Sequence, residues 1–524
     1  MSTGKYPYSS QNHAVARSAA LIGLATLTSR FLGFIRDIII ARLFGIYLYA
    51  QAFVIAFRIP NLFRDLVGEG AANAAIVPVL TEYSIQHSKE EFWELANILL
   101  NILIVILSAI TILGMIFSPL IVRLIAPGFI AFPEKLQATI NLNRIIFPYI
   151  LLIGLAVYIM AVLNSLKNFV VSAFAPCLLN IAIIICALIF GEGTAGLATG
   201  VLVGGVLQLA VQIPTVYRKG LRFKPLLNFR HPAVLKISHL MLPRLASSGI
   251  YQLNNFVDTI FGSFVGIVGD GGVAVLYFAY RLIQLPVGIF SNALAQAILP
   301  TFSTQVLESN HNNLKITLSW ALRTVFFVML PASVIFMVLA QPLVTTFFSG
   351  GKFDLRAGYL TSQALFFYSI GLTAYGATKI LQSCFFALKD TIIPTKIAGL
   401  SLILNIVFNA VLMFPLKISG LALATSLSGI ISFICLFFLL VRRLDGFSER
   451  KIVFSLLRIL AASFCMAAVC FVVNQALNLG WALFCGLLSY IIFCFLFRVP
   501  ELRELWHWLL GKNSVNTLWD RYRT

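Results

Sequence analysis

The sequence predicts an all-α polytopic membrane protein that crosses the bilayer about fourteen times. Three observations lead to this prediction: 60% of the 524 residues are hydrophobic, only 11% are charged, and apolar runs recur along the whole chain. A soluble domain is nearer half apolar and a quarter charged. A run of about 20 apolar residues is long enough to cross the hydrocarbon core as a helix.

The apolar runs give the order of the expected helices. The N-terminal stretch is polar and is not followed by a clean cleavage site, so we interpret the first run as a retained helix. Span 2 is the least regular, because Arg58, Pro60 and Asn61 interrupt it. The expected spans are 18–42, 47–66, 92–124, 142–166, 173–191, 196–217, 237–266, 273–302, 318–348, 359–387, 393–414, 418–442, 453–475 and 479–498.

Loop charge predicts that both termini lie in the cytoplasm. Lys and Arg are enriched in cytoplasmic loops, and with the N-terminus inside they favour that side by roughly three to one. An even number of spans returns the C-terminus to the same side. Topology-setting Lys and Arg in these loops are the first explanation of the net charge of +19, which then does not require nucleic acid as a partner. An anionic substrate is the second explanation, and it needs Arg inside the spans.

An internal repeat supports a division into two lobes. LNSLKN at 163–168 resembles FFALKD at 385–390, an offset of 222 residues. AGLATGVLVGG at 195–205 resembles SGLALATSLSG at 419–429, an offset of 224 residues. An offset of six spans leaves the two copies in the same orientation, so the repeat is parallel.

The repeat therefore predicts two parallel six-helix lobes plus two extra C-terminal helices. A basic amphipathic segment between the lobes is expected to lie on the anionic inner leaflet of the membrane. The expected domains are an N-lobe at 1–217, the cytoplasmic linker at 218–236, a C-lobe at 237–443, spans 13 and 14 at 444–498, and a cytoplasmic tail at 499–524.

Ionisable residues inside the expected spans are candidate functional residues. A charge in the bilayer costs a few kcal/mol, so such residues face protein or a water-filled cavity. Span 1 carries Arg30, Arg36 and Asp37. For Arg36 and Asp37 the alternative is an internal arrangement that only holds helices together.

The repeat pairs these charges with others in the second lobe. Asp258 corresponds to Asp37 at an offset of 221, and Arg281 corresponds to Arg58 at an offset of 223. A pseudo-twofold axis would bring them to the seam between the lobes, where transporter sites lie. An excess of Arg over Asp suits a phosphate group, which a guanidinium grips in a bidentate manner, and argues against a cationic drug.

Three further residues complete the candidates derived from the spans. Arg64 and Glu69, at the inner end of span 2, either anchor a helix end or form a mouth for a head group from the inner leaflet. Lys379, inside span 10, either faces the cavity or pairs with an acid or the backbone. No nucleotide, zinc or serine-hydrolase motif is evident, so we expect no cofactor and no enzyme. Transport energy is then expected from the membrane potential or from a Na+ or H+ gradient.

Several segments together resemble the MurJ/MviN family of lipid II flippases. The most distinctive are SRFLGFIRD at 29–37 and PNLFRDLVGEGA at 60–71, and the similarity covers almost the whole chain. The resemblance implies the fold of the multidrug/oligosaccharidyl-lipid/polysaccharide exporter superfamily. It also implies alternating access that moves lipid II outward across the bacterial inner membrane. Spans 13 and 14 would then form a groove for the undecaprenyl tail.

The resemblance also extends to single residues and partners. Arginines that the family needs match Arg30, Arg36, Arg64 and Arg281, and its acid matches Asp37. The implied partners are lipid II and membrane lipids, and the chain is expected to be a monomer that associates with the cell-wall synthesis machinery.

Two positions depart from the family pattern, because many relatives have an acid where this chain has Gln51 and Tyr280. Both changes make the expected cavity more positive, and they put in doubt a role in ion coupling for these positions. The alternatives are a flippase for another polyprenyl-linked oligosaccharide, or a drug exporter of the same superfamily. A membrane enzyme would need acidic residues gathered on the outer loops, where only scattered acids are found.

Overall fold

The structure is a computed structural model that describes residues 8–65, 75–191, 193–447 and 449–509. Over these ranges the chain forms helices and the turns between them, and its β-structure is an isolated bridge between Gly350 and Phe353. The all-α prediction is therefore confirmed. Packing divides the chain into two compact units, one of residues 1–274 with 350–354 and one of residues 275–349 with 355–524.

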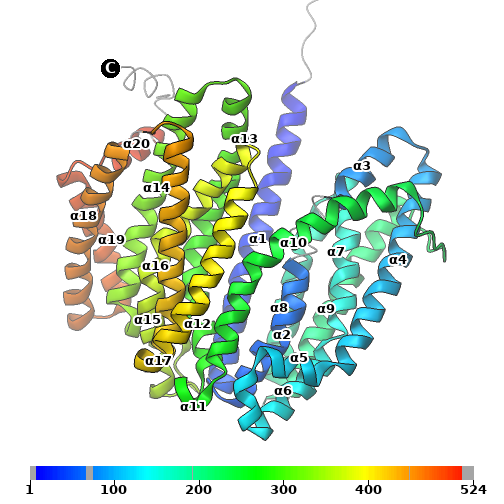
Figure 1. The fold of residues 1–524 in the computed structure, drawn as a ribbon, viewed down its shortest axis with the longest axis horizontal. Coiled ribbons are helices and arrows are strands. Elements are labelled where there is room, and N and C mark those ends of the chain that lie inside the picture. Colours follow the sequence, from blue (N-terminus) through cyan, green and yellow to red (C-terminus); the bar gives the residue numbers. More distant parts are fainter. Residues whose placement is uncertain (1–7, 66–74, 192, 448, 510–524) are drawn as a thin grey trace, which may run out of the picture. The chain divides into compact units, whose positions relative to one another are not determined.

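The first unit contains the helices from α1 to α11 (Figure 1). They are α1 (Tyr8–Phe44), α2 (Leu48–Arg64), α3 (Val77–Gln86), α4 (Lys89–Ile116), α5 (Ser118–Ile125), the short η2 (Pro127–Ala131), α6 (Pro133–Ile146), α7 (Tyr149–Ser165), α8 (Val170–Phe190), α9 (Thr194–Lys219), α10 (Pro232–Gly262) and α11 (Val265–Val268).

The second unit contains the remaining helices, which begin with most of α12. They are α12 (Gly272–Pro286), the π-helical η3 (Val287–Ser291), α13 (Asn292–Leu307), α14 (His311–Val338), α15 (Ala340–Phe348), α16 (Leu355–Ala387), α17 (Ile392–Arg443), α18 (Glu449–Ala476), α19 (Leu479–Leu496) and α20 (Pro500–Leu509).

Ten helices of the described chain are long and apolar enough to cross a membrane, judged by length and composition. One of them, α17, covers two expected spans, and the non-helical backbone of Lys417 separates its two parts. Three helices at expected spans, α1, α2 and α10, are not among the ten. Span 3 was expected to run unbroken to residue 124, and this was wrong, because α4 ends at Ile116 and α5 begins at Ser118. The total of fourteen stays a prediction.

Glycines set the closest helix contact of the first unit. Gly196, Gly200 and Gly204 follow one another at four-residue spacing on α9, so they form one stripe that faces α8. A β-carbon added at Gly200 would lie 2.7 Å from the α-carbon of Ile183. Small residues let helix backbones approach in this way, and van der Waals packing then replaces the hydrophobic driving force that the bilayer lacks.

The sequence repeat is also a repeat of local backbone structure. Lys167 and Lys389, 222 residues apart, have φ angles of 58° and 57° at the C-terminal ends of α7 and α16. The next amide bonds five residues back in both cases, from Asn168 to Leu163 and from Asp390 to Phe385. This is the Schellman arrangement that closes a helix end.

The two units do not coincide with the lobes expected from the repeat. Helix α10, which the repeat assigns to the second lobe, packs on α3, α5 and η2 and belongs to the first unit. The expected linker is an irregular segment at 220–231 between α9 and α10. The lobes were predicted from the sequence repeat, and their boundaries stay a prediction. The units are defined by which helices pack together.

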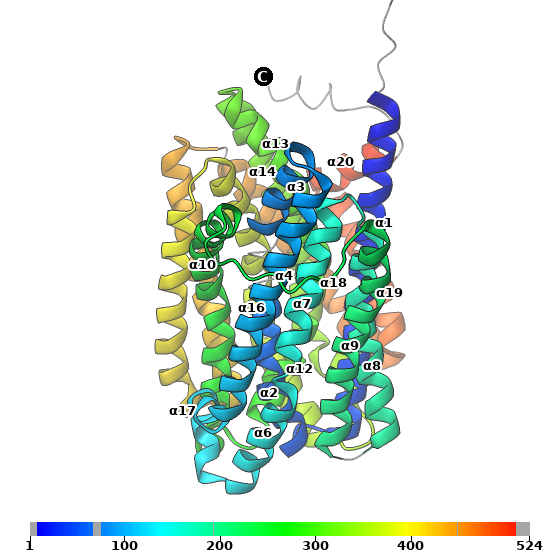
Figure 2. The same cartoon turned by 90° about the vertical axis from the view of Figure 1, so that its right-hand side faces the viewer.

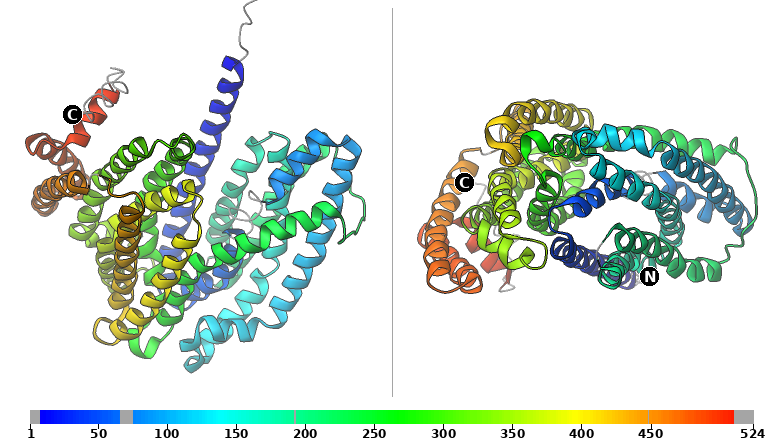
Figure 3. Two further views of the ribbon diagram at one scale, coloured as in Figure 1. Left: turned by 45° about the horizontal axis from the view of Figure 1, so that its top comes forward. Right: turned by 90° about the horizontal axis from the view of Figure 1, so that it is seen from below.

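A buried ion pair holds the C-terminal helix within the second unit. Arg323 on α14 donates a 2.9 Å hydrogen bond to Glu501 on α20, and Ser455 on α18 donates to the same oxygen at 2.7 Å. Helices α18 and α19, in orange and red, run side by side (Figure 3). Burial raises the pKa of the neighbouring Glu504 carboxyl; Arg323 opposes this and Glu501 adds to it.

Candidate functional site

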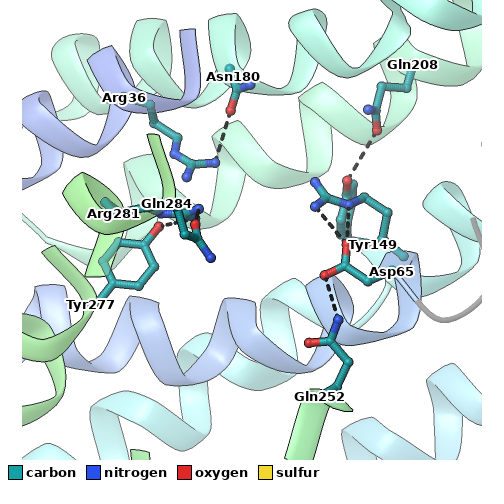
Figure 4. Close-up of polar contacts among 10 residues, drawn as sticks. Arg36, Asp65, Tyr149, Asn180, Gln208, Gln252, Tyr277, Arg281 and Gln284 are labelled. Carbon is teal, nitrogen blue, oxygen red and sulfur yellow. Dashed lines mark hydrogen bonds and ion pairs between the residues drawn. The ribbon is translucent and has the colours of Figure 1, made fainter. Parts of the chain in front are cut away.

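The contact between α1 and α8 holds a buried polar cluster in the first unit. The guanidinium of Arg36 donates two hydrogen bonds to Oδ1 of Asp37, at 2.8 and 3.0 Å. It donates a third to Oδ1 of Asn180 at 3.0 Å (Figure 4). Asn180 in turn donates to the carbonyl of Ser29 at 3.1 Å. Arg36 is 5% exposed and Asp37 is 1% exposed. In this conformation Arg36 and Asp37 therefore have the geometry expected of the alternative interpretation, in which they only hold helices together.

Arg30 lies on the same helix in a different environment. It is exposed, and it makes no hydrogen bond or ion pair to another residue in the described ranges. Six residues separate it from Arg36, which corresponds to about 240° around a helix of 3.6 residues per turn, so the two side chains leave α1 on different faces. Arg30 is thus available to an anion, whereas Arg36 is already engaged.

Helix α2 connects the cluster to a second ion pair through aromatic rings. The Arg36 guanidinium lies 5.7 Å from the centre of the Phe57 ring, and Phe57 packs at 6.1 Å from Tyr149. The buried Tyr149 hydroxyl donates to Gln208 at 3.3 Å, and the Tyr149 side chain lies beside Asp65 (Figure 4). Arg58, the next residue after Phe57, is half-buried.

Arg64 ends α2 in an ion pair with its own neighbour. Its Nη2 lies 2.9 Å from Oδ1 of Asp65, and the two side chains are 35% and 22% exposed. Gln252 on α10 approaches the other carboxylate oxygen of Asp65 at 3.5 Å (Figure 4). The pair is half-open to solvent, so a competing anion could take the guanidinium at modest cost. Glu69 lies outside the described residues.

In the second unit, Arg281 on α12 is held by neutral groups of its own helix. Its Nη2 donates to the Tyr277 hydroxyl at 2.8 Å, and its Nη1 donates to Oε1 of Gln284 at 2.9 Å (Figure 4). The guanidinium also lies 4.7 Å from the centre of the Tyr277 ring. These two hydrogen bonds orient the guanidinium.

The sequence singled out Arg281 but missed these two supports. Tyr277 and Gln284 lie four residues before and three residues after Arg281, and helical spacing could have found them. The remaining candidates, Asp258 on α10 and Lys379 on α16, are half-buried, and their roles stay predictions. Tyr280 packs on Tyr368 with ring centres 5.5 Å apart.

Gln51 lies in a separate cluster of the first unit. It is fully buried, and its amide donates to Oδ1 of Asp270 at 2.9 Å. Lys135 makes an ion pair with the same carboxylate and lies over the rings of Phe129 and Phe132. Burial raises the pKa of Asp270, but the bonds from Lys135 and Gln51 outweigh it, so the pKa is lowered overall.

Taken separately, the two units thus offer guanidinium groups in two states. Arg30 is exposed, and Arg58, Arg64 and Arg281 are half-buried, whereas Arg36 is buried and paired. Guanidinium groups that water can reach suit phosphate oxygens, because their paired N–H groups match the spacing of those oxygens. In the described part of the chain, no group of three or more His, Cys, Asp and Glu residues could hold a metal ion.

Comparison with known families decides the classification. Residues 40–492 match the model of a family described as "Lipid II flippase MurJ". The chain belongs to this lipid II flippase family. The match covers most of the sequence and includes α2, Arg58, Arg64 and Arg281. The family is one of transporters, so the chain is not expected to catalyse a covalent reaction.

Curated relatives agree with the family assignment. A "Probable lipid II flippase MurJ" of Buchnera aphidicola subsp. Schizaphis graminum is 35% identical over 433 residues, which cover 82% of this chain and 84% of that protein. The "Lipid II flippase MurJ" of Burkholderia cenocepacia is 33% identical over 426 residues, which cover 80% of this chain and 82% of that protein.

Solved structures show the same fold. The chain matches a structure described as "Lipid II flippase MurJ, inward closed conformation" with a TM-score of 0.78 and 26% identity, over 93% of this chain and 99% of that one. An inward-facing multidrug resistance transporter of the MATE family has a TM-score of 0.65 at 16% identity, over 80% of this chain and 96% of its own. The second likeness concerns the fold alone.

Proposed function

We propose that this protein moves lipid II, the undecaprenyl-diphosphate-linked precursor of peptidoglycan, from the inner to the outer leaflet of the bacterial inner membrane. The family match over residues 40–492 is the observation that carries the proposal. The guanidinium groups support it independently, because the diphosphate is the charged part of such a cargo and arginine is the side chain best suited to it.

The arginines divide into two roles in this proposal. Arg30, Arg58, Arg64 and Arg281 contact the diphosphate as it passes, because each is exposed or half-buried. Arg36 braces α1 against α8 through Asp37 and Asn180 in the present conformation. A direct contact of Arg36 with the cargo would require this cluster to open first.

Alternating access is the mode of transport that the fold supports. The protein would expose its site first to one leaflet and then to the other. An anion that leaves a negative interior gains about 2.3 kcal/mol per charge for each 100 mV of membrane potential. The potential, or a Na+ or H+ gradient, would therefore supply the free energy.

The last two spans would carry the lipid tail. Helices α18 and α19 expose large apolar side chains, among them Phe464, Phe471, Phe484 and Phe495, which are 53–81% exposed. Such surfaces suit acyl or polyprenyl chains. We also propose that both termini are cytoplasmic, that the chain acts as a monomer, and that it works beside the cell-wall synthesis machinery.

A set of arginine variants tests the proposal. Each variant serves as the sole flippase in cells depleted of their own, and lipid II on the outer leaflet is measured. Arg281→Ala and Arg30→Ala should reduce outward lipid II by at least about tenfold, which corresponds to about 1.4 kcal/mol of lost anion binding. Arg450→Ala, which removes an exposed arginine at the start of α18, should have no effect. Normal lipid II exposure with both site variants would contradict the proposal.

A further inference from the structure

The segment between α9 and α10, residues 220–231, carries an unusual surface. It contains three basic residues, Arg222, Lys224 and Arg230, and no acidic residue, and Arg218 and Lys219 at the end of α9 precede it directly. Three large apolar side chains of the segment are also exposed: Phe223 by 64%, Leu227 by 57% and Phe229 by 52%. Exposed apolar groups interleaved with cations are typical of surfaces that bind anionic membranes. We call residues 220–231 the strap.

Buried amides of α4 fix the strap in place. The backbone N–H of Lys224 donates to Oδ1 of Asn97 at 2.9 Å, and Nδ2 of Asn101 donates to the Lys224 carbonyl at 2.7 Å. Asn97 is 1% exposed and Asn101 is 7% exposed. Figure 2 shows the thin strap crossing in front of α4. The strap is therefore attached to the first unit by its backbone, and its large apolar side chains, Phe223, Leu227 and Phe229, stay exposed.

The turn that enters the strap is equally specific. Gly220 has a φ of 125°, and a β-carbon there would lie 2.7 Å from Nε1 of Trp93. Arg222 then folds back, so that its guanidinium lies 3.7 Å from the centre of the Tyr217 ring and donates to the Tyr217 carbonyl at 2.9 Å. Only glycine accommodates both this φ and this close approach.

The two hydrogen bonds that Asn97 and Asn101 make with Lys224, which we call the Asn97 clamp, set the depth of the strap in the membrane. Helix α4 has 28 residues, or about 42 Å at 1.5 Å per residue, whereas the hydrocarbon core is about 30 Å thick. About 20 helical residues cross the hydrocarbon core. If Ile116 lies at one boundary of the core, the other boundary therefore lies at the level of Asn97. Trp93 would then lie one turn further out, at the head groups, where tryptophan is enriched.

We propose that the strap is a membrane-surface anchor that binds the anionic head groups of the adjoining leaflet. Phe223, Leu227 and Phe229 would enter the boundary between head groups and acyl chains. Lys219, Arg222 and Arg230 would bind lipid phosphates. The anchor would fix the first unit at a set depth in the bilayer, and it does not depend on which cargo the protein carries.

Hydrogen–deuterium exchange of the full-length protein in lipid nanodiscs tests the anchor. The amides of Phe223, Leu227 and Phe229 make no hydrogen bond within the described chain, so any protection must come from lipid. Exchange over 221–231 is compared in nanodiscs of a zwitterionic lipid with and without phosphatidylglycerol. We expect exchange to be at least about tenfold slower with the anionic lipid, since several cations each favour the anionic surface.

Two charge variants decide the result. Lys219→Glu with Arg230→Glu should abolish the lipid-dependent slowing, while leaving the Asn97 clamp in place. Lys396→Glu with Arg450→Glu, which reverses two exposed cations elsewhere, should leave it unchanged. Equal exchange rates in the two lipid compositions, or slowing that survives in the strap variant, would overturn the proposal. The strap variant should still move lipid II, so failure of the anchor is distinguishable from failure of the transport proposal.

Discussion

Asp37→Ala is the substitution that tests the bracing role of the α1–α8 cluster. Asp37 is 1% exposed and accepts both short hydrogen bonds from Arg36. Removal of one member of a buried ion pair costs about 3–5 kcal/mol, because the remaining charge keeps its desolvation penalty without its partner. Asn180 stays bonded to Arg36, but it is neutral and cannot cancel the charge.

A matched double variant separates the lost charge partner from the lost packing. Arg36→Met with Asp37→Leu replaces the pair by apolar groups of similar size, which is often neutral for stability. In equilibrium unfolding from detergent micelles, Asp37→Ala should therefore lose about 3–5 kcal/mol, and the double variant should recover most of it. A loss below about 1 kcal/mol in Asp37→Ala, or a double variant as unstable as the single one, would refute the reasoning.

Three further predictions follow from other contacts. Gly200→Val should destabilise the α8–α9 contact by about 1–3 kcal/mol in a thermal melt, whereas Gly249→Val, where a β-carbon meets nothing within 4 Å, should cost less; equal losses would contradict the packing argument. Gln51→Glu would place two carboxylates together at Asp270, so its melting temperature should rise more steeply than that of the parent as the pH falls from 8 to about 5; parallel curves would argue against the pairing. Because the pKa of Glu504 is raised, the docking of α20 is most stable below pH 4.5, the ordinary pKa of a glutamate, and weakens as the pH rises through the raised value. Glu504→Gln removes this charge and should slow amide exchange over 500–509 at pH 7.5, whereas faster exchange would contradict the prediction.

Most of the helix order could be predicted from the sequence, because an apolar run that crosses the bilayer must satisfy its own backbone hydrogen bonds and therefore forms a helix. The expected span at 173–191 matches α8 at Val170–Phe190, and the one at 479–498 matches α19 at Leu479–Leu496. The short helices α3 and α20 escaped this method, since neither is long enough to cross the bilayer. The end of span 3 was placed too late, because α5 continues the apolar run of α4 after one residue.

The pairing of the candidate residues could be predicted only in part. Arg36 and Asp37 are neighbours in the sequence, yet their burial depends on Asn180, 144 residues away on α8. The partner of Gln51 is Asp270, 219 residues away, so hydropathy and spacing within span 2 contain no information about it. By contrast, Tyr277, Arg281 and Gln284 lie on one helix, and their contacts follow from local spacing alone.

The most direct test of the central claim is a measurement of lipid II on the outer leaflet of living cells in which this chain is the sole flippase. Cells that express it should display as much outward lipid II as cells with their own flippase, and depletion should trap the precursor inside. Trapped lipid II despite normal levels of this protein in the membrane would contradict the account.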